Sequence, residues 1–289
     1  IATDADPKIV HGLFRGSQYV GEAFGVVLVR VRESKSDRKP QQTNNAESRQ
    51  SNPKQAPKKK HQSIAHHIEV ATFRTEGGYA DGRRPDQVQW ATAREDVLRR
   101  DFTINGLLGD PLAESESDRV IDHVGGVADI QAKLIRAIGE PTERFAEDQL
   151  RLLRALRFAA RLDFAIEEET WLALRALADT ITSVSAERTR DELQRILTEG
   201  GAQRGWALLR ASDLLERVLP EPRSAEAVQA RLRDVPLSPE QGWTAVLMDV
   251  APAPGVVPEW GRRLRISKAL TRHVTTAVQI THTLLRYEQ

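Results

Sequence analysis

The 289-residue sequence contains no cysteine, a single methionine and only 5% aromatic residues. The absence of cysteine excludes disulfide partners, thiolate metal sites and cysteine nucleophiles. No apolar run approaches the ~18–20 residues that a membrane-spanning helix needs, so no membrane partner is expected. The first ten residues, IATDADPKIV, lack the basic region and apolar segment of a secretory signal. These absences predict a cytoplasmic location.

The sequence also lacks a charge of one dominant sign, because 42 basic and 41 acidic residues leave a net charge of +1. This balance argues neither for nor against a nucleic-acid partner. With 40% hydrophobic residues the chain can bury a core, and its length suggests about two domains. It does not begin with methionine, which predicts that it is a fragment of a longer protein.

The first half of the sequence mixes strand and helix patterns. An Asp-Pro pair predicts a short helix over residues 8–14. Residues 19–31 and 67–74 have strand character, and they would pair as a hairpin across the insert between them. That insert, residues 32–61, has almost no large apolar residue and is predicted to be a disordered, tolerated loop. Its Lys-rich end leaves RNA contact open as an alternative.

Further along, the pattern becomes helical. Residues 94–108 show a helix-like period, and residues 120–139 predict a strand, a Gly-Gly turn and a short helix ending at Gly139. From Phe145 onward every periodic segment is amphipathic and helical. The sequence therefore predicts an α/β first half followed by a helical second half.

Two segments of the first half carry candidate phosphate and sugar ligands. The Gly-rich loop 77–86 holds Asp81, Arg83 and Arg84, which could order around a phosphate; an ordinary polar turn is the simpler alternative. On a helix, Asp101 and Asn105 would share a face and could hold both hydroxyls of a ribose, with Arg99 or Arg100 beside a phosphate. A surface ion pair with a helix cap is the alternative there.

The most informative segment spans residues 147–161. One acid and four arginines recur at intervals of 3, 3, 3 and 4, which predicts a single helical face made of Asp148, Arg151, Arg154, Arg157 and Arg161. Such arginines repel one another unless an anion lies across them. An aspartate accepts a hydrogen bond from an exocyclic amine and an arginine donates to a ring nitrogen or carbonyl, so the pair could read a base edge. A solvated basic face is the alternative.

Metal-ligand patterns are weak. Asp4-Ala5-Asp6 has the form D-x-D, but its position before Pro7 suits a helix cap. The pairs His66-His67 and Asp122-His123 lack partners at metal-ligand spacing.

Taken together, RRDFTIN, VIDHVGGVADIQAKLIRAIG and RFAEDQLRLLRALRFAARLDFAIE resemble the class II tRNA nucleotidyltransferase and bacterial poly(A) polymerase family. The resemblance runs from Ile1 to about Gly200 with only the insert interrupting it, and residues 264–274 are more weakly similar to a body-domain segment. It implies an α+β fold. An incomplete polymerase-β-like nucleotidyltransferase head over residues 1–139 would precede an all-α neck over 140–200 and an RNA-binding body over 201–289.

The resemblance also implies roles for the residues that match. Arg100 would lie near the triphosphate, Asp101 and Asn105 near the ribose, and the loop 77–86 would help in nucleotide selection. In the helical segment, Asp148 and Arg151 would serve as the amino-acid template for the base.

The same match implies that Arg154 and Arg157 support nucleotide binding. The metal ligands of the family, a D-x-D and an earlier G-G-x-V-R-D loop, would precede Ile1, so this chain lacks them. Only Glu69 falls where a third carboxylate could approach Mg²⁺. Because the other metal ligands are missing, the 289 residues alone are expected to have almost no nucleotidyltransferase activity.

For the complete protein, the resemblance implies nucleotidyl transfer without a nucleic-acid template. The 3′-hydroxyl of an RNA would attack the α-phosphate of CTP or ATP with the help of Mg²⁺, and pyrophosphate would leave. The expected outcome is addition of CMP and AMP to the 3′ end of tRNA. A bacterial poly(A) polymerase acting on other RNA 3′ ends stays open, as does a non-catalytic protein that binds RNA in the old nucleotide site.

Overall fold

The computed structural model describes residues 1–20, 25–32, 65–77, 87–115, 119–219, 225–250 and 255–287. The Gly-rich loop with Asp81, Arg83 and Arg84 lies outside these residues, as does the predicted insert apart from Arg32. That residue corrects the predicted boundary, because it is the last residue of strand β3 and pairs with Ala65. The chain forms two compact units, one of residues 1–77 and 87–96, the other of residues 78–86 and 97–289.

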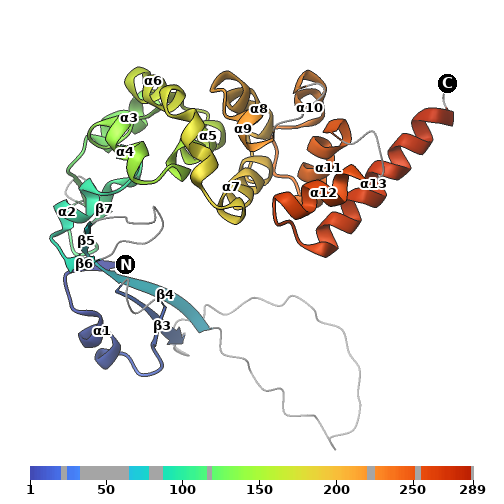
Figure 1. Cartoon of the computed structure of the whole chain (residues 1–289). Coiled ribbons are helices and arrows are strands. Elements are labelled where there is room, and N and C mark those ends of the chain that lie inside the picture. Colours follow the sequence, from blue (N-terminus) through green and yellow to red (C-terminus); the bar gives the residue numbers. More distant parts are fainter. Residues whose placement is uncertain are drawn as a thin grey trace, which may run out of the picture. The chain divides into compact units, whose positions relative to one another are not determined.

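The first unit is built on a four-stranded sheet with the order β1-β4-β3-β2 (Figure 1). Strands β3 (Val26–Arg32) and β4 (Ala65–Thr72) pair antiparallel, which confirms the predicted hairpin. Strand β1 (Ala2–Thr3) runs parallel to β4, and β2 (Gln18–Tyr19) lies antiparallel to β3. The two short strands that follow, β5 (Arg74–Gly77) and β6 (Gln87–Trp90), pair separately.

Helix α1 (Pro7–Leu13) confirms the predicted short helix. Asp6 caps it, accepting a hydrogen bond of 2.8 Å from the backbone N–H of Lys8, which is the cap that the Asp-Pro pair predicts. The helix packs on β3 and β4, where a small apolar core consists of Val10, Val27, Val29 and Val70.

The helix predicted over residues 94–108 is wrong beyond its first part. Helix α2 (Ala93–Leu98) is followed by a single 3₁₀ turn, η3 (Thr103–Asn105), and by strand β7 (Leu107–Gly109). Strand β7 pairs antiparallel with β8 (Val120–Asp122). The apolar spacing arises instead from burial of isolated side chains such as Val97 and Phe102, both fully buried.

The helix predicted to end at Gly139 ends earlier. Helix α3 (Gly126–Ala132) stops at Lys133, whose left-handed φ of 54° terminates the helical turn, and β9 (Leu134–Ile135) follows. Strand β9 pairs with β10 (Ala165–Ile166). Residues that local periodicity assigns to a helix therefore form a strand instead, because they pair with a strand that is distant in the sequence.

The second unit continues as a helical array, which confirms the predicted helical second half and the mixed α and β class. Its helices are α4 (Pro141–Glu147), α5 (Leu150–Leu162), α6 (Glu168–Ala176), η4 (Ala178–Ser183, 3₁₀), α7 (Ala186–Thr198), α8 (Ala202–Ala211), α9 (Leu215–Val218), α10 (Ala225–Arg231), α11 (Pro239–Val250), α12 (Val256–Arg263) and α13 (Lys268–Tyr287).

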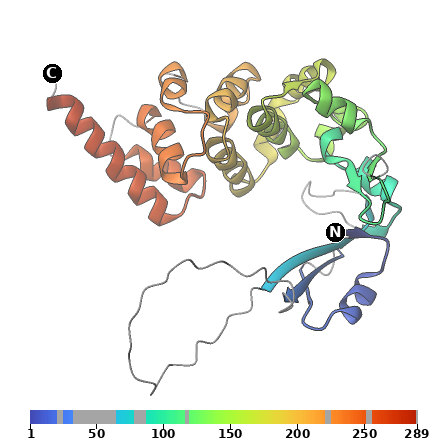
Figure 2. The same ribbon diagram turned by 180° about the vertical axis from the view of Figure 1, so that it is seen from behind.

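One hydrophobic core runs through this array. Helix α5 packs on α7 and α8, α7 packs on α11, and α11 packs on α12 and α13 (Figures 1 and 2). Trp206 and Trp243 are among its largest fully buried side chains. Gly201 allows α8 to begin against α5, because a Cβ there would lie 2.3 Å from the Ala160 carbonyl oxygen. None of the described helices is long and apolar enough to cross a membrane.

Candidate functional site

Asp101 is the centre of one cluster of predicted site residues. Its carboxylate is almost fully buried and accepts hydrogen bonds from the side-chain amide of Asn105 (2.9 Å) and from Nε of Arg154 (2.7 Å). Asp101 and Asn105 lie close together, as the sequence predicts. They meet across the 3₁₀ turn, however, and not along one face of an α-helix. The second contact brings in Arg154 from 53 residues away.

Arg151 ties the segment around Asp101 to helix α5. Its guanidinium donates to the Arg99 carbonyl oxygen (3.0 Å), to the Arg144 carbonyl oxygen (3.0 Å) and to the Glu147 carboxylate (2.7 Å). Glu147 also pairs with Arg144, whose pKa is lowered by burial although the nearby carboxylate opposes that effect. Arg100 in turn donates to the Asn105 carbonyl oxygen at 2.8 Å.

The predicted single helical face over Asp148–Arg161 is wrong at its first residue. Asp148 has extended backbone angles (φ −147°, ψ 103°) that separate α4 from α5. Its carboxylate accepts a hydrogen bond from the Leu150 backbone N–H (3.1 Å) and pairs with Arg188 of α7 (2.8 Å). The side chain is 22% exposed, so part of it faces outward from this break.

The arginines farther along α5 are neutralised by carboxylates of the protein itself. Arg157 is only 4% exposed and pairs with buried Glu192 of α7 and with Glu199 (3.2 Å). Arg161, half exposed, shares Glu199 at 3.1 Å. The row of arginines therefore needs no external anion to offset the repulsion between its charges. This corrects the expectation from the sequence, which took that repulsion as a reason for a bound anion.

Phe158 lies between two of these arginines. The Arg154 and Arg157 guanidinium carbons are 5.4 Å and 4.2 Å from its ring centroid, and Phe102 meets the ring edge-on at 5.8 Å. This stacking fixes the orientation of both arginines and links them to the segment that carries Asp101.

Sequence reasoning missed Arg188 and Phe158 as parts of this site. Ser185 and Arg188 mark the start of a helix in the sequence, but nothing in the local pattern connects them with Asp148, 40 residues earlier. Glu192 and Glu199 were missed for the same reason. Only packing of α7 against α5 places these side chains.

Glu69 belongs to the first compact unit. It lies on β4 opposite Leu28, its side chain is exposed, and its carbonyl oxygen accepts a hydrogen bond from the Ile1 amino group at 2.7 Å. Among the described residues no group of three His, Asp or Glu side chains could hold a metal ion. A single exposed carboxylate does not satisfy octahedral Mg²⁺, so the described residues by themselves do not form a magnesium site.

The sequence matches two families in the regions that build this fold. Residues 57–136 match the family described as "Poly A polymerase head domain", and residues 163–226 match "Probable RNA and SrmB- binding site of polymerase A". The chain is 38% identical over 221 residues to a CCA-adding enzyme of Pediococcus pentosaceus, covering 73% of this chain and 53% of that protein. The chain belongs to the family of CCA-adding enzymes and bacterial poly(A) polymerases.

Other members of this family show how far the likeness extends. A CCA-adding enzyme of Enterococcus faecalis is 31% identical over 284 residues, which are 96% of this chain and 61% of that protein. The crystal structure of the Bacillus stearothermophilus CCA-adding enzyme in complex with CTP matches 95% of this chain and 56% of its own (TM-score 0.57, 25% identity).

A tRNA nucleotidyltransferase complexed with a primer tRNA and an incoming ATP analog shares the fold over 99% of this chain and 76% of its own, with a TM-score of 0.68 at 20% identity. The matches agree with a polymerase-β-like head followed by helical domains. The chain spans about half the length of the first curated relatives that it matches.

Proposed function

We propose that the whole protein adds CMP and AMP to the 3′ end of tRNA without a nucleic-acid template. The observation that carries the proposal is the partly exposed Asp148 carboxylate, held by Arg188 and adjacent to Arg151. The RNA partner, the nucleotides CTP and ATP, and a cytoplasmic location belong to the same proposal.

The choice between nucleotides follows from hydrogen-bond chemistry. Cytosine and adenine both carry an exocyclic amine where guanine and uracil carry a carbonyl oxygen. An ionised Asp148 accepts from an amine and repels a carbonyl oxygen, so it favours CTP and ATP over GTP and UTP.

Arg151 can supply the complementary donors. A guanidinium has five N–H groups, and three of the Arg151 groups point to Glu147, Arg144 and Arg99. Nε and the second Nη2 hydrogen have no partner among the described residues, and they are available for a ring nitrogen or carbonyl oxygen of the base.

The remaining predicted residues position the nucleotide. Arg100 would neutralise its phosphates, while Asp101 with Asn105 would orient the ribose. Arg154 holds the Asp101 carboxylate, and Arg157 acts through its packing on Phe158, because its guanidinium is bound to Glu192 and Glu199. In the Gly-rich loop, Asp81, Arg83 and Arg84 stay predicted contributors to nucleotide selection.

Enzymes of this family generally use a divalent metal, and we propose Mg²⁺ for the whole protein, which would stabilise charge on the reacting phosphate. Glu69 is the described carboxylate proposed to approach it. The domain boundaries after residues 139 and 200 likewise stay proposals.

The proposal is tested first by nucleotide binding to the chain itself. In isothermal titration calorimetry, Asp148→Ala should reduce the preference for CTP and ATP over GTP and UTP by about 5- to 150-fold, the range of about 1–3 kcal/mol for one base contact. Binding of RNA should change little. Equal loss of nucleotide and RNA affinity would contradict the template role.

A second experiment separates the alternatives. The full-length protein is offered labelled CTP or ATP with tRNA lacking the CCA end, tRNA lacking the final A, and an unrelated RNA. A short defined end on tRNA alone supports the proposal. Long A tails on any RNA would favour a poly(A) polymerase, and RNA binding without incorporation would favour the non-catalytic alternative.

A further inference from the structure

The first turn of helix α7 is held by contacts with distant parts of the chain and not by its own cap. Ser185 stands at the N-cap position, yet its side chain makes no capping hydrogen bond. Its Oγ is buried and has no hydrogen-bond partner among the described residues. A serine at this position normally stabilises a helix by accepting a hydrogen bond from a backbone N–H of the first turn. The start of α7 therefore lacks the local contact that usually prevents fraying.

Two sides of this first turn contact different parts of the second compact unit. Arg188 lies on the side that faces α5, where it pairs with Asp148 at 2.8 Å. Glu187 and Arg190, three residues apart, contact the turn between α12 and α13 (residues 264–267). Residues 188 and 190 are about 200° apart around the helix axis, so they point to nearly opposite sides. Helix α7 thus connects the α12–α13 turn with Asp148 (Figure 1).

The guanidinium group of Arg190 is oriented by its neighbour in the sequence. Its Nε and Nη2 both donate to one carboxylate oxygen of Asp191, at 2.9 Å and 2.6 Å. Nη1 donates to the carbonyl oxygen of Arg265, 75 residues away. The side chain of Arg190 is 22% exposed, so water competes only partly for these hydrogen bonds. Arg190 therefore attaches the first turn of α7 to a main-chain atom of the α12–α13 turn.

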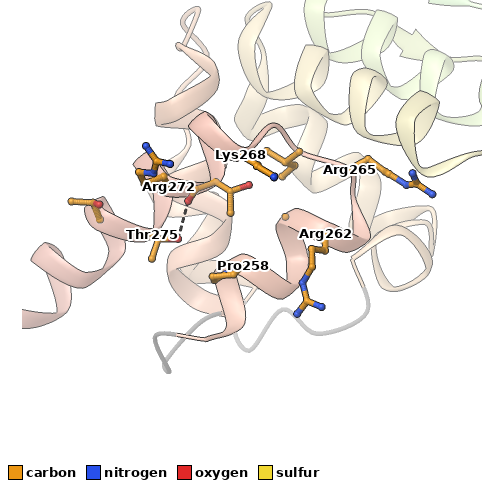
Figure 3. Close-up of a pocket in the computed structure, with 10 residues that line it drawn as sticks. Pro258, Arg262, Arg265, Lys268, Arg272 and Thr275 are labelled. Carbon is orange, nitrogen blue, oxygen red and sulfur yellow. Dashed lines mark hydrogen bonds between the residues drawn. The ribbon is translucent and has the colours of Figure 1, made fainter.

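The backbone of the α12–α13 turn is itself fixed. Arg265, which Figure 3 labels on this turn, has a left-handed φ of 53°. The backbone N–H of Ile266 donates to the Gly261 carbonyl oxygen at 2.8 Å, and that of Arg265 donates to the Arg262 carbonyl oxygen at 3.2 Å. These two hydrogen bonds form a Schellman motif, and buried Ile266 supplies its hydrophobic contact. The carbonyl oxygen that Arg190 contacts therefore has a defined position.

The side chain of Arg265 makes the weaker of the two contacts with α7. Its Nε lies 3.5 Å from Oε1 of Glu187, and the two side chains are 67% and 47% exposed. Ion pairs between exposed side chains contribute little, because water and salt screen both charges. The attachment of α7 to the turn therefore depends mainly on Arg190.

We propose that Arg190 is a positioning residue for nucleotide choice. By attaching the first turn of α7 to the α12–α13 turn, it fixes the place of Arg188 and hence the direction of the Asp148 carboxylate. Hydrogen bonds weaken steeply as their angle departs from linearity, so a small displacement of Arg188 reduces the discrimination between CTP and UTP. This inference rests on the proposed template role of Asp148, and it adds a residue that acts through Arg188.

The first test measures the affinities of the chain for CTP and UTP by isothermal titration calorimetry. Arg190→Met keeps an apolar stem but removes the donors, and it should lower the ratio of CTP to UTP affinity about three- to tenfold. This loss should be smaller than that of Asp148→Ala. Arg190→Lys, which keeps a charge and a donor, should restore part of the ratio. An unchanged ratio in Arg190→Met would overturn the proposal.

Two further variants serve as controls for the carbonyl contact. Arg195→Met removes an exposed arginine from the last turn of the same helix and should leave the affinity ratio unchanged. Arg265→Gly removes the guanidinium group that faces Glu187 but keeps the carbonyl oxygen, because glycine readily adopts a left-handed φ. Its ratio should stay within about twofold of the native value. A fall as large as that of Arg190→Met in either control would overturn the role of Arg190.

A double-variant cycle tests the route through Arg188. If Arg190 acts by placing Arg188, then Arg190→Met should have almost no further effect on the affinity ratio when Arg188 is already replaced by glutamine. The two substitutions would then be strongly non-additive. Additive effects of Arg188→Gln and Arg190→Met would overturn the proposed route.

Amide hydrogen exchange provides a measurement that needs no nucleotide. Arg190→Met should speed up exchange in the first turn of α7 while exchange in α8 stays at the native rate. Native protection of that first turn would overturn the attachment by Arg190. The two proposals fail in different ways: an unchanged affinity ratio in Asp148→Ala would contradict the template role, whereas an unchanged ratio in Arg190→Met alone would contradict only the positioning role.

Discussion

Two arginine-rich regions of the second compact unit differ in how their charges are balanced. Along α5, Arg151, Arg154 and Arg157 each bind a carboxylate of the protein. Around a pocket lined by residues of α12, of α13 and of the turn that connects them, Arg262 and Arg272 bind none among the described residues (Figure 3). Both regions are rich in arginine, yet one is an internal ion-pair network and the other an open cationic surface.

The difference indicates two uses of the same side chain. Paired guanidinium groups have fixed directions. Arg154 orients the Asp101 carboxylate, and Arg151 binds Glu147 and the Arg144 carbonyl oxygen just before the helix break at Asp148. Exposed, unpaired groups keep their long-range attraction for a polyanion, which salt screens. We therefore expect substitutions at the buried, paired positions along α5 to change stability and nucleotide choice.

The largest effect is expected from Arg157→Ala. This change would leave Glu192, whose side chain is 5% exposed, as an uncompensated buried charge, which typically costs about 3–5 kcal/mol. Urea denaturation followed by circular dichroism measures the loss. The double variant Arg157→Met/Glu192→Leu should recover most of it, because both charges are then removed. A single variant within about 1 kcal/mol of the native protein would refute the paired arrangement.

An intermediate effect is expected from Arg188→Gln. Loss of its ion pair would release the Asp148 carboxylate and reduce the preference for CTP over UTP, by less than Asp148→Ala does. Both partners are less than a third exposed, so a loss of about 1–2 kcal/mol in stability is also expected. Titration calorimetry with CTP and UTP provides the measurement. Arg188→Lys should partly restore the preference, and an unchanged preference in Arg188→Gln would exclude a positioning role.

The smallest effect is expected from Arg161→Gln, at the exposed end of the same row. Arg161 is half exposed, and solvent-exposed ion pairs contribute about 0–1 kcal/mol. Its unfolding free energy should therefore lie within about 0.5 kcal/mol of the native value. A loss of stability as large as that of Arg157→Ala would show that the exposed ion pair of Arg161 contributes as much to stability as the buried ion pair of Arg157.

Local sequence patterns predicted much of the fold. The strand character of β3 and β4 follows from residue patterns within each segment, and the Asp6 cap follows from a cap residue before proline, so these features depend on nearest neighbours in the chain. Prediction failed where long-range pairing competes with local periodicity. Lys133 ends α3 in a left-handed conformation because strand β9 must pair with β10 from 30 residues further on.

The candidate site likewise has features that the sequence predicts and features that only the tertiary structure determines. The sequence by itself determined most of the candidate residues, because RRDFTIN and the aspartate with its arginines are chemical groups at fixed spacing. Only the tertiary structure decided which arginines are neutralised. Arg188 and Glu192 reach the row from α7, and Glu199 reaches it from the residue that follows α7. A charge pair between distant segments leaves no periodic trace in the sequence. Burial then separates Arg157, fixed inside the protein, from Arg272, exposed at the pocket.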